Sequence, residues 1–196
     1  DGEACSDATV YCGSVAADTL DGMLQDAGQV VKVSPGDCIR IGRVSVKVHP
    51  GRHARPGRTA LKTLLSPRMV RYAGNALALA WLNRRFPEGG QTLVYEMEAE
   101  GKTVLLLGSM DLAPEADYPK GADLLILPFQ GCPDPAGQAA RIVERLRPKR
   151  ILLDHFDDAF PPVSRSVDTR PFKKLMQERY PDIRTAKPVA GRPVEL

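Results

Sequence analysis

The chain has 196 residues, of which 43% are hydrophobic and 26% charged, and its formal net charge is +3. This composition is typical of a soluble globular protein, and the length is sufficient for one domain with a hydrophobic core. No apolar stretch approaches the roughly 20 residues that a membrane helix needs, and the small net charge does not indicate a nucleic-acid partner. We therefore expect a single domain over residues 1–196, whose partner is neither a membrane nor a nucleic acid.

The cysteines and the first residues indicate a cytoplasmic protein. Cys5, Cys12, Cys38 and Cys132 are scattered and form no CxxC pair. This usage argues against a zinc ribbon and favours reduced thiols. The chain opens with Asp1, and no apolar segment typical of a signal peptide follows it.

The first part of the chain predicts short strands and one helix. Ser14 can cap a helix over residues 15–27, which Gly28 would end. Short strands are expected over residues 9–12, 30–33, 38–41 and 44–48. The turn signal Ser-Pro-Gly-Asp at residues 34–37 joins the second of these strands to the third.

The middle of the chain combines helical spacing with a later hairpin. Apolar residues between 69 and 81 follow a helical period, and prolines interrupt the surrounding segment. We expect a helical insertion over residues 54–90 that lies over the edge of the sheet. Two strands, over 93–98 and 102–107, then flank a turn containing Gly101.

The second half alternates regularly between strands and helices. Strands are predicted over residues 123–127, 150–154 and 183–186, with helices over 135–146 and 168–179. Asp134 followed by Pro135 is a good helix start, and Asp168 is the expected cap of the last helix. Hairpins followed by β-α-β units predict an α/β protein with a mixed sheet.

Three of the predicted strands lead into candidate metal ligands, which are His53, Asp111 and His155. Ligands commonly bind where the carboxyl ends of strands meet at one edge of a helix-covered sheet. Two imidazoles and a carboxylate from separate strands therefore predict a metal site built by the fold. Such ligands suit zinc, and manganese or iron would also fit them.

Each candidate also has a purely structural explanation. His53 could be a loop histidine in a basic stretch, His155 a hydrogen-bonded core residue, and Asp111 a helix cap. Asp157 and Asp158 could move a proton or orient the ring of His155, or they could belong to a solvated turn.

Basic residues gather beside the expected site. They could attract an anionic substrate such as a phosphate ester or a nucleotide, or they could form a solvated charged face. The residues are Arg52, Arg55, Arg58, Lys62, Arg68 and Arg71.

Several segments together resemble the metallo-β-lactamase fold hydrolases. The similar segments are SPGD and IRIG within residues 34–42, GKTVLLLG at 101–108, GADLLILP at 121–128 and RPKRILLDH at 147–155. The resemblance covers about residues 8–190 and corresponds to the later part of that fold. It implies a metallo-β-lactamase-like αββα sandwich that lacks its N-terminal portion, including the family's His-x-His-x-Asp-His motif.

The resemblance also implies an activity. It suggests a hydrolase in which one or two zinc ions activate a water against an ester, lactone, amide or phosphoester. His53, Asp111 and His155 would be metal ligands, and Asp157 or Asp158 would serve catalysis. In the family the bridging aspartate directly follows the glycine, whereas here Ser109 has that place and Asp111 comes two residues later.

Alternatives remain open from the sequence. The departure at Ser109 favours a degenerate, non-catalytic member of the fold that binds a ligand or a partner. The second half alone could be a doubly wound ligand-binding domain, although it has no glycine fingerprint for phosphate. If the chain is the whole molecule, we expect weak or no metal binding, and its edge near residues 189–196 could pair with a second copy.

Overall fold

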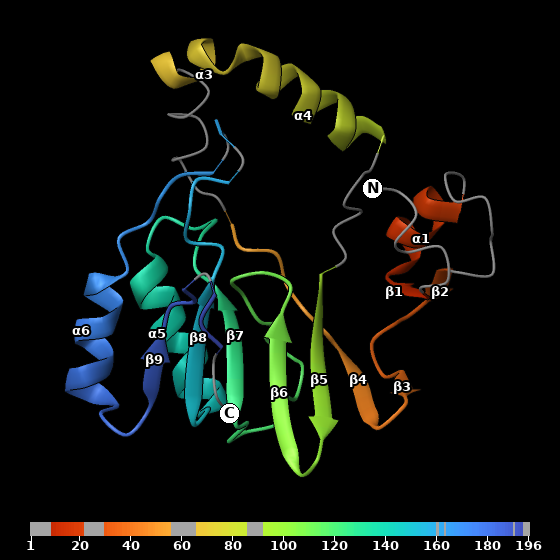
Figure 1. Ribbon diagram of the computed structural model, residues 1–196, viewed down its shortest axis with the longest axis vertical. Helices are drawn as coiled ribbons and strands as arrows, with labels where there is room; N and C mark the ends of the chain where they lie inside the picture. The colour runs from red at the N-terminus through yellow and green to blue at the C-terminus, as the bar shows by residue number, and fades with distance from the viewer. Residues whose placement is uncertain are drawn as a thin grey trace.

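The computed structural model describes residues 9–21, 30–55, 66–85, 92–159, 161–162, 164–189 and 191–193. In this part of the chain, seven strands form one sheet in the order β3-β4-β5-β6-β7-β8-β9 (Figure 1). Strands β1 and β2 form a separate two-stranded sheet. The predicted α/β class with a mixed sheet is confirmed.

The N-terminal sheet is small. Strands β1 (Val10–Cys12) and β2 (Val30–Lys32) pair in parallel. Helix α1 (Ser14–Asp21) follows β1, and the remainder of the helix expected over residues 15–27 lies outside the described residues.

Antiparallel pairing builds one half of the main sheet. Strands β3 (Cys38–Ile41) and β4 (Val44–Pro50) form a hairpin, and β4 pairs next with β5 (Leu93–Ala99). Strand β6 (Lys102–Leu107) completes the second predicted hairpin. Its turn has positive φ at both central residues, which matches the right-handed twist of the two strands.

Parallel pairing builds the other half. Strands β7 (Leu124–Pro128), β8 (Arg150–Asp154) and β9 (Arg184–Ala186) continue the sheet beyond β6 in parallel. Parallel neighbours need long crossover connections. Helices α5 (Pro135–Leu146) and α6 (Arg170–Arg179) supply two of these connections and contact each other.

Local capping chemistry explains where the two helices begin. The carboxylate of Asp134 accepts a hydrogen bond from the backbone N–H of Gly137 at 2.9 Å, so α5 begins as predicted. The prediction that Asp168 caps α6 is wrong by one position. Thr169 occupies the cap, because the helix starts at Arg170 beside Pro171, while Asp168 accepts from the backbone N–H of Arg170.

The main hydrophobic core lies between the sheet and these two helices. Alternate residues of the strands face the core, as a period of two requires. They are Leu105, Leu107, Leu125, Leu127, Ile151 and Leu153, all almost fully buried. The rings of Phe129 and Phe172 pack in the same core with their centroids 5.4 Å apart.

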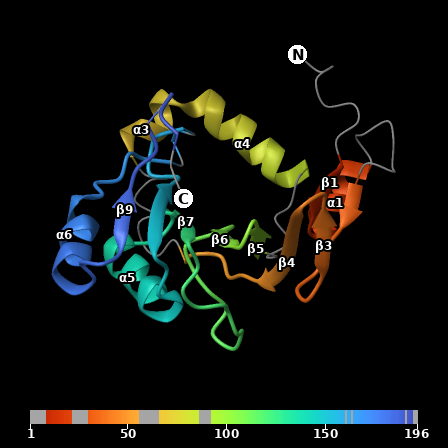
Figure 2. The same ribbon diagram turned by 60° about the horizontal axis from the view of Figure 1, so that its bottom comes forward.

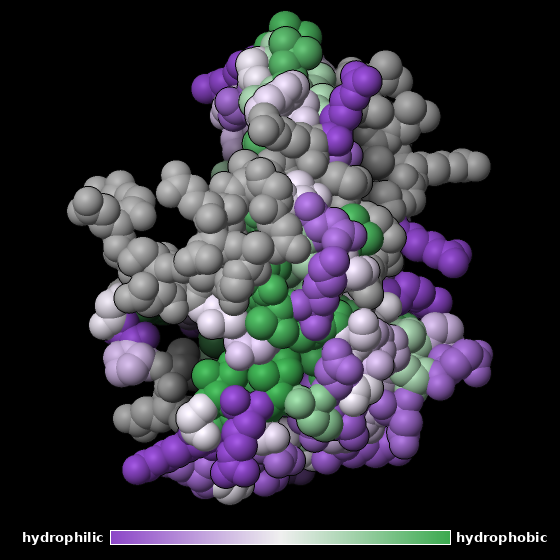
Figure 3. Space-filling model, turned by 90° about the vertical axis from the view of Figure 1, so that its right-hand side faces the viewer, coloured by the Kyte–Doolittle hydropathy of each residue, from purple (hydrophilic) through white to green (hydrophobic). Residues whose placement is uncertain are grey.

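Within the described part of the chain, the opposite face of the sheet is less covered. Helices α5 and α6 lie on one side of the sheet (Figure 2). On the other side, Leu106, Ile126 and Leu152 are only half-buried. Seen from the side of β3 and β4, hydrophobic residues form a patch at the surface (Figure 3).

Helices α3 (Pro67–Arg71) and α4 (Ala73–Arg85) lie beyond the edge at which β6, β7 and β8 end (Figure 1). Arg68 forms an ion pair with Asp158, and Asn75 donates to the carbonyl of Pro161 at 3.2 Å. These contacts tie the two helices to the loop after β8. Residues 56–65 and 86–90 of the expected insertion lie outside the described residues, so the insertion itself stays a prediction.

None of the helices that the structure describes is long and apolar enough to cross a membrane.

Candidate functional site

The candidate ligands follow strands that end at one edge of the sheet. Strand β4 is antiparallel to β5, and β5 is antiparallel to β6, so β4 and β6 run in the same direction. Strands β6, β7 and β8 are mutually parallel neighbours. The loops that contain His53, Asp111 and His155 therefore all leave the same edge.

Two glycines allow the ends of β4 and β6 to approach β5 closely. A Cβ on Gly51 would lie 2.8 Å from the carbonyl oxygen of Thr92, and a Cβ on Gly108 would lie 2.7 Å from that of Leu93. Beyond these glycines, the N–H of Ala54 donates to Oγ of Ser109 at 3.0 Å. The loop of His53 is therefore held against the residue that follows β6.

His53 is exposed on this loop. Its Nδ1 lies 2.9 Å from the carbonyl oxygen of Ala54. Since a carbonyl only accepts, Nδ1 carries the proton in this arrangement, and in a neutral imidazole of this tautomer Nε2 would hold the lone pair. Nε2 is thus the nitrogen suited to a metal or to a proton.

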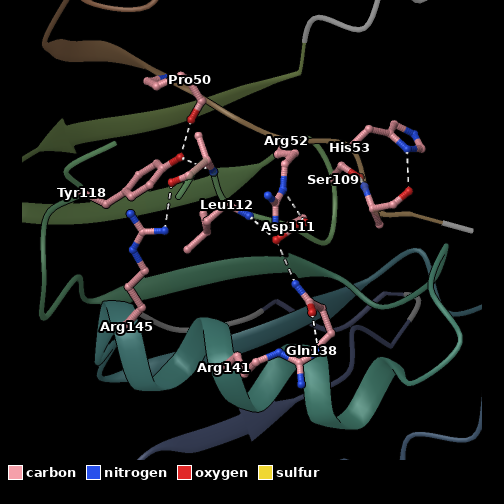
Figure 4. Close-up of polar contacts among 12 residues, drawn as sticks. Pro50, Arg52, His53, Ser109, Asp111, Leu112, Tyr118, Gln138, Arg141 and Arg145 are labelled. Carbon is pink, nitrogen blue, oxygen red and sulfur yellow. Dashed lines mark hydrogen bonds and ion pairs between the residues drawn. The ribbon is translucent and has the colours of Figure 1, made fainter. Parts of the chain in front are cut away.

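Asp111 is engaged on the side of helix α5 (Figure 4). Its Oδ2 accepts from Nε of Arg52 at 2.6 Å, and its Oδ1 accepts from Nε2 of Gln138 at 2.9 Å. Oδ1 also accepts from the N–H of Leu112, which continues into a bridge with Gly51 and not into a helix. The helix-cap explanation is therefore wrong, and the ligand role stays a prediction.

His155 faces another hollow. Its backbone is left-handed with φ of +49°, which ends the regular alternation of β8. His155, Asp154 and Asp157 line a cleft of about 500 Å³ together with Tyr95 and Gly108. The cleft is continuous with the end of β6, but Asp111 does not line it.

The two aspartates after His155 have different surroundings. Arg68 and the hydroxyl of Ser164 bind the carboxylate of Asp158, and the hydrogen bond from Arg68 lowers the pKa of Asp158. Asp158 therefore stays ionised near neutral pH. Asp157 lines the cleft, and its carbonyl accepts from the amide of Gln130 at 3.0 Å. Their catalytic roles stay predictions.

Gln130 is a positioning residue that the sequence did not reveal. Its amide also donates to the carbonyl of Arg165 at 3.0 Å and accepts from the N–H of Arg165 at 3.1 Å. Gln130 therefore bridges Asp157, near the start of the loop after β8, and Arg165, further along the same loop. Its place directly after the buried β7 and Phe129 was the available signal, since polar residues at strand ends point to function.

The buried polar pair His49 and Glu96 was also not expected as a unit. Nε2 of His49 lies 2.6 Å from Oε2 of Glu96, and both side chains are mostly buried. The ring of Tyr118 packs against His49, and its hydroxyl donates to the carbonyl of Pro50. Burial raises the pKa of Tyr118, so its hydroxyl remains protonated at neutral pH. The pair of His49 and Glu96 therefore links β4 to β5 near the end of β4.

The predicted ligands do not form one cluster. Among the described residues, no group of three or more His, Cys, Asp or Glu side chains could hold a metal ion. Asp111 is bound to Arg52, whereas His155 lines a cleft that Asp111 does not reach. These residues alone therefore do not fit a metal centre.

A further cleft lies between the loop after β4 and helix α5. Its volume is about 420 Å³. Burial raises the pKa of the Cys132 thiol in this cleft, so the thiol stays protonated at neutral pH. The polar lining includes Arg52, Arg55, Asp111, Cys132, Gln138 and Arg141.

No protein-family model and no curated protein matches the chain. Several solved structures do. YhfI of Bacillus subtilis, a metallo-β-lactamase fold protein, is 12% identical, with a TM-score of 0.53 over 94% of this chain and 64% of its own. A "possible metal-dependent hydrolase" from Veillonella parvula is 12% identical, with a TM-score of 0.53 over 97% of this chain and 68% of its own.

A third similar structure is a provisionally named metal-dependent hydrolase from Parabacteroides distasonis. It is 15% identical, with a TM-score of 0.51 over 91% of this chain and 63% of its own. Nearly all of this chain is thus aligned, but it spans only about two thirds of the length of each structure. The order of the elements, the mixed sheet and these alignments agree, and the chain has the metallo-β-lactamase fold.

Proposed function

We propose that this protein is a metal-dependent hydrolase whose reaction takes place at the shared edge of the sheet. The observation that carries the proposal is the fold, since solved structures of metal-dependent hydrolases align with nearly the whole chain. This edge carries imidazole side chains of the kind that bind metals. His53, Ser109 and His155 follow strands that run in one direction, and the hydrogen bond from the N–H of Ala54 to Ser109 holds two of these loops together.

The proposal includes a metal and a substrate class. Imidazole and carboxylate ligands suit zinc, with manganese or iron as alternatives. The substrate would be an ester, a lactone, an amide or a phosphoester. Because the described residues do not fit a metal centre by themselves, the ligand set must draw on further residues, and we derive no catalytic step through a metal.

The roles of individual residues follow from their surroundings. His53 is exposed on its loop, and His155 lines the cleft at the edge of the sheet. Asp158 remains a carboxylate beside Arg68, so its role would be to accept a hydrogen bond or a proton, not to donate one. Asp157, which lines the cleft with His155, would orient the ring of His155 or relay a proton.

A non-catalytic role is the second candidate. It is favoured by Asp111, whose carboxylate already holds Arg52 and Gln138 and would have to leave both to reach a metal. Ser109 is also committed to the N–H of Ala54. A protein with this arrangement could bind a small ligand without turning it over.

We also propose a cytoplasmic location. Cys38 and Cys132 form no disulfide in the described chain, as a reducing compartment would require.

Metal content and hydrolysis, measured on the polypeptide as its gene encodes it, test the proposal. We expect hydrolysis of a nitrophenyl ester, a lactone or a bis-nitrophenyl phosphate, lost with a chelator and restored by zinc. His155→Asn should abolish most of this activity, since asparagine tolerates the left-handed backbone but is a poor metal ligand. Arg40→Gln, on the exposed strand β3, is the control.

The two candidates give opposite results. A protein that takes up no metal and hydrolyses none of these substrates, yet binds a ligand with unchanged affinity after His155→Asn, would be a binding module.

A further inference from the structure

We propose that the cleft between the loop after β4 and helix α5 binds the phosphate group of a small phosphate ester. The cleft is separate from the one that His155 lines. The proposal does not depend on the hydrolase activity, because guanidinium groups bind a phosphate without a metal.

Three guanidinium groups give the cleft its positive charge. Arg52, Arg55 and Arg141 line it, and only Arg52 has a carboxylate partner among the described residues. The cleft contains two carboxylates, Asp111 and Asp134, and Asp134 accepts a hydrogen bond from the first turn of α5. The lining therefore has a surplus of donors and of positive charge, and guanidinium forks match phosphate oxygens.

A continuous series of hydrogen bonds fixes two of these arginines (Figure 4). Nε of Arg52 donates to Asp111 at 2.6 Å, and the amide of Gln138 donates to the same carboxylate at 2.9 Å. The carbonyl oxygen of Gln138 in turn accepts from Arg141 at 2.6 Å. Arg52 and Arg141 are thus positioned before a ligand arrives, and less conformational entropy remains to be lost on binding.

The size and the lining of the cleft indicate a small organic phosphate. Its volume of about 420 Å³ is within the range of small-molecule sites, and Ala54 and Met110 provide apolar surface beside the arginines. The thiol of Cys132 remains neutral and adds no charge. Phosphate esters carry close to two negative charges at neutral pH, which suits several guanidinium groups better than a single carboxylate does.

Arg145 forms a boundary and is not part of the binding set. It lines a smaller hollow of about 200 Å³ on the other side of the hydrogen-bonded series. Its guanidinium already donates to the carbonyls of Ala113 and Ala116. Arg145 therefore holds the loop of Ala113 and Ala116 in place, and Arg145→Gln would not test phosphate binding.

Titration with phenyl phosphate, followed by calorimetry and by amide chemical shifts, tests the proposal. The chelator stays present throughout, so the result is independent of any metal or hydrolysis. We expect phenyl phosphate to bind at least about tenfold more tightly than benzoate, with shifts confined to residues 52–55, 110–111 and 132–141. Arg141→Gln should weaken binding about tenfold or more, and Arg141→Lys should restore only part of it. Arg40→Gln, which removes the same charge elsewhere, should leave binding unchanged.

Asp111→Asn distinguishes binding by preorganised arginines from attraction of the phosphate by net charge alone. The change raises the net charge of the cleft by one, so simple attraction predicts tighter binding. Preorganisation predicts weaker binding, because the asparagine amide cannot both accept from Arg52 and keep Gln138 in place. Tighter binding by Asp111→Asn would overturn the proposal. So would equal losses in Arg141→Gln and Arg40→Gln, equal affinity for benzoate, or shifts located elsewhere.

Discussion

The helix-covered half of the sheet and the N-terminal part of the chain differ in how they are stabilised. Strands β6 to β8 share one large core with α5 and α6, in which Leu105, Leu125 and Leu153 are fully buried. The cluster beside β1, β2 and β4 has three buried hydrophobic residues in the described chain, Val33, Val48 and Leu93. Among the described residues, the helix-covered half of the sheet thus has a much larger buried hydrophobic core than the cluster beside β1, β2 and β4.

The same contrast separates two helices. Helix α5 buries Val143 and Leu146 completely against the sheet. Helix α4 leaves Leu77 73% exposed and Trp81 57% exposed, and its Asn75 donates a hydrogen bond to the carbonyl of Pro161. Helical spacing of apolar residues therefore does not by itself predict burial, because burial also needs a complementary surface.

The largest loss of stability is expected in the core between α6 and the sheet. Phe172→Ala should lower the free energy of unfolding by about 3–5 kcal/mol, because it leaves a cavity between α6 and the sheet. Val33→Ala in the smaller cluster should cost only about 1–2 kcal/mol. Urea denaturation measures both, with the exposed Leu77→Ala as a control expected within about 0.5 kcal/mol of the wild type. Equal costs for the two buried changes would contradict the comparison.

Removing one partner of the buried pair should also be costly. His49→Leu leaves Glu96 in a mostly buried position without its partner at 2.6 Å, and a buried polar group left without its hydrogen-bond partner typically costs about 1–3 kcal/mol. The double change His49→Leu with Glu96→Leu should recover part of the loss, since no polar group is then left unpaired. A double variant as unstable as the sum of the singles would show that the two side chains are not coupled.

Gly108 tests the close approach that positions the site. In Gly108→Ala the new Cβ would meet the carbonyl oxygen of Leu93 at 2.7 Å, so the backbone must shift. We expect the free energy of unfolding, measured by urea denaturation, to fall by about 1–3 kcal/mol, and the contact between Ser109 and Ala54 to weaken. Gly74→Ala on the first turn of α4 has nothing within 4 Å and should leave stability unchanged or raise it by up to about 1 kcal/mol.

The smallest expected effect is a pH dependence at Asp168. The hydrogen bonds from Arg170 lower the pKa of Asp168 to about 2. A lowered pKa in the folded state means that the contribution is present above the unfolded value of 3.8 and is lost as pH falls through about 2. Unfolding free energies measured from pH 6 to pH 2 should therefore fall less steeply below pH 4 in Asp168→Asn. An unchanged slope would show that the pair is screened by solvent at this exposed position.

Locally encoded elements agree best with the sequence. The bounds of α5 and β8 match the predicted ranges 135–146 and 150–154, because Asp134, Pro135 and an apolar run define them within a few residues. The cap at Asp168 was misplaced by one residue, because two neighbouring residues, Asp168 and Thr169, both have cap-forming side chains. Alternation also identified the core faces of the strands.

The candidate site was less accessible to sequence reasoning. The pattern of strands located His53, Asp111 and His155 at one edge, because the chain direction of each strand follows from the order of hairpins and crossovers. It did not reveal that Arg52 and Gln138 hold Asp111, or that the left-handed backbone at His155 directs its side chain to another cleft. The partners of Asp111 come from positions 59 residues before it and 27 after it.

The sequence by itself determined the elements, their order and the edge at which polar residues collect, since these depend on local capping, periodicity and connection length. The tertiary structure decided which side chains meet there. Hydrogen-bond partners are chosen by distance and direction in space, and in the folded chain the carboxylate of Asp111 lies within hydrogen-bond distance of Arg52 and Gln138.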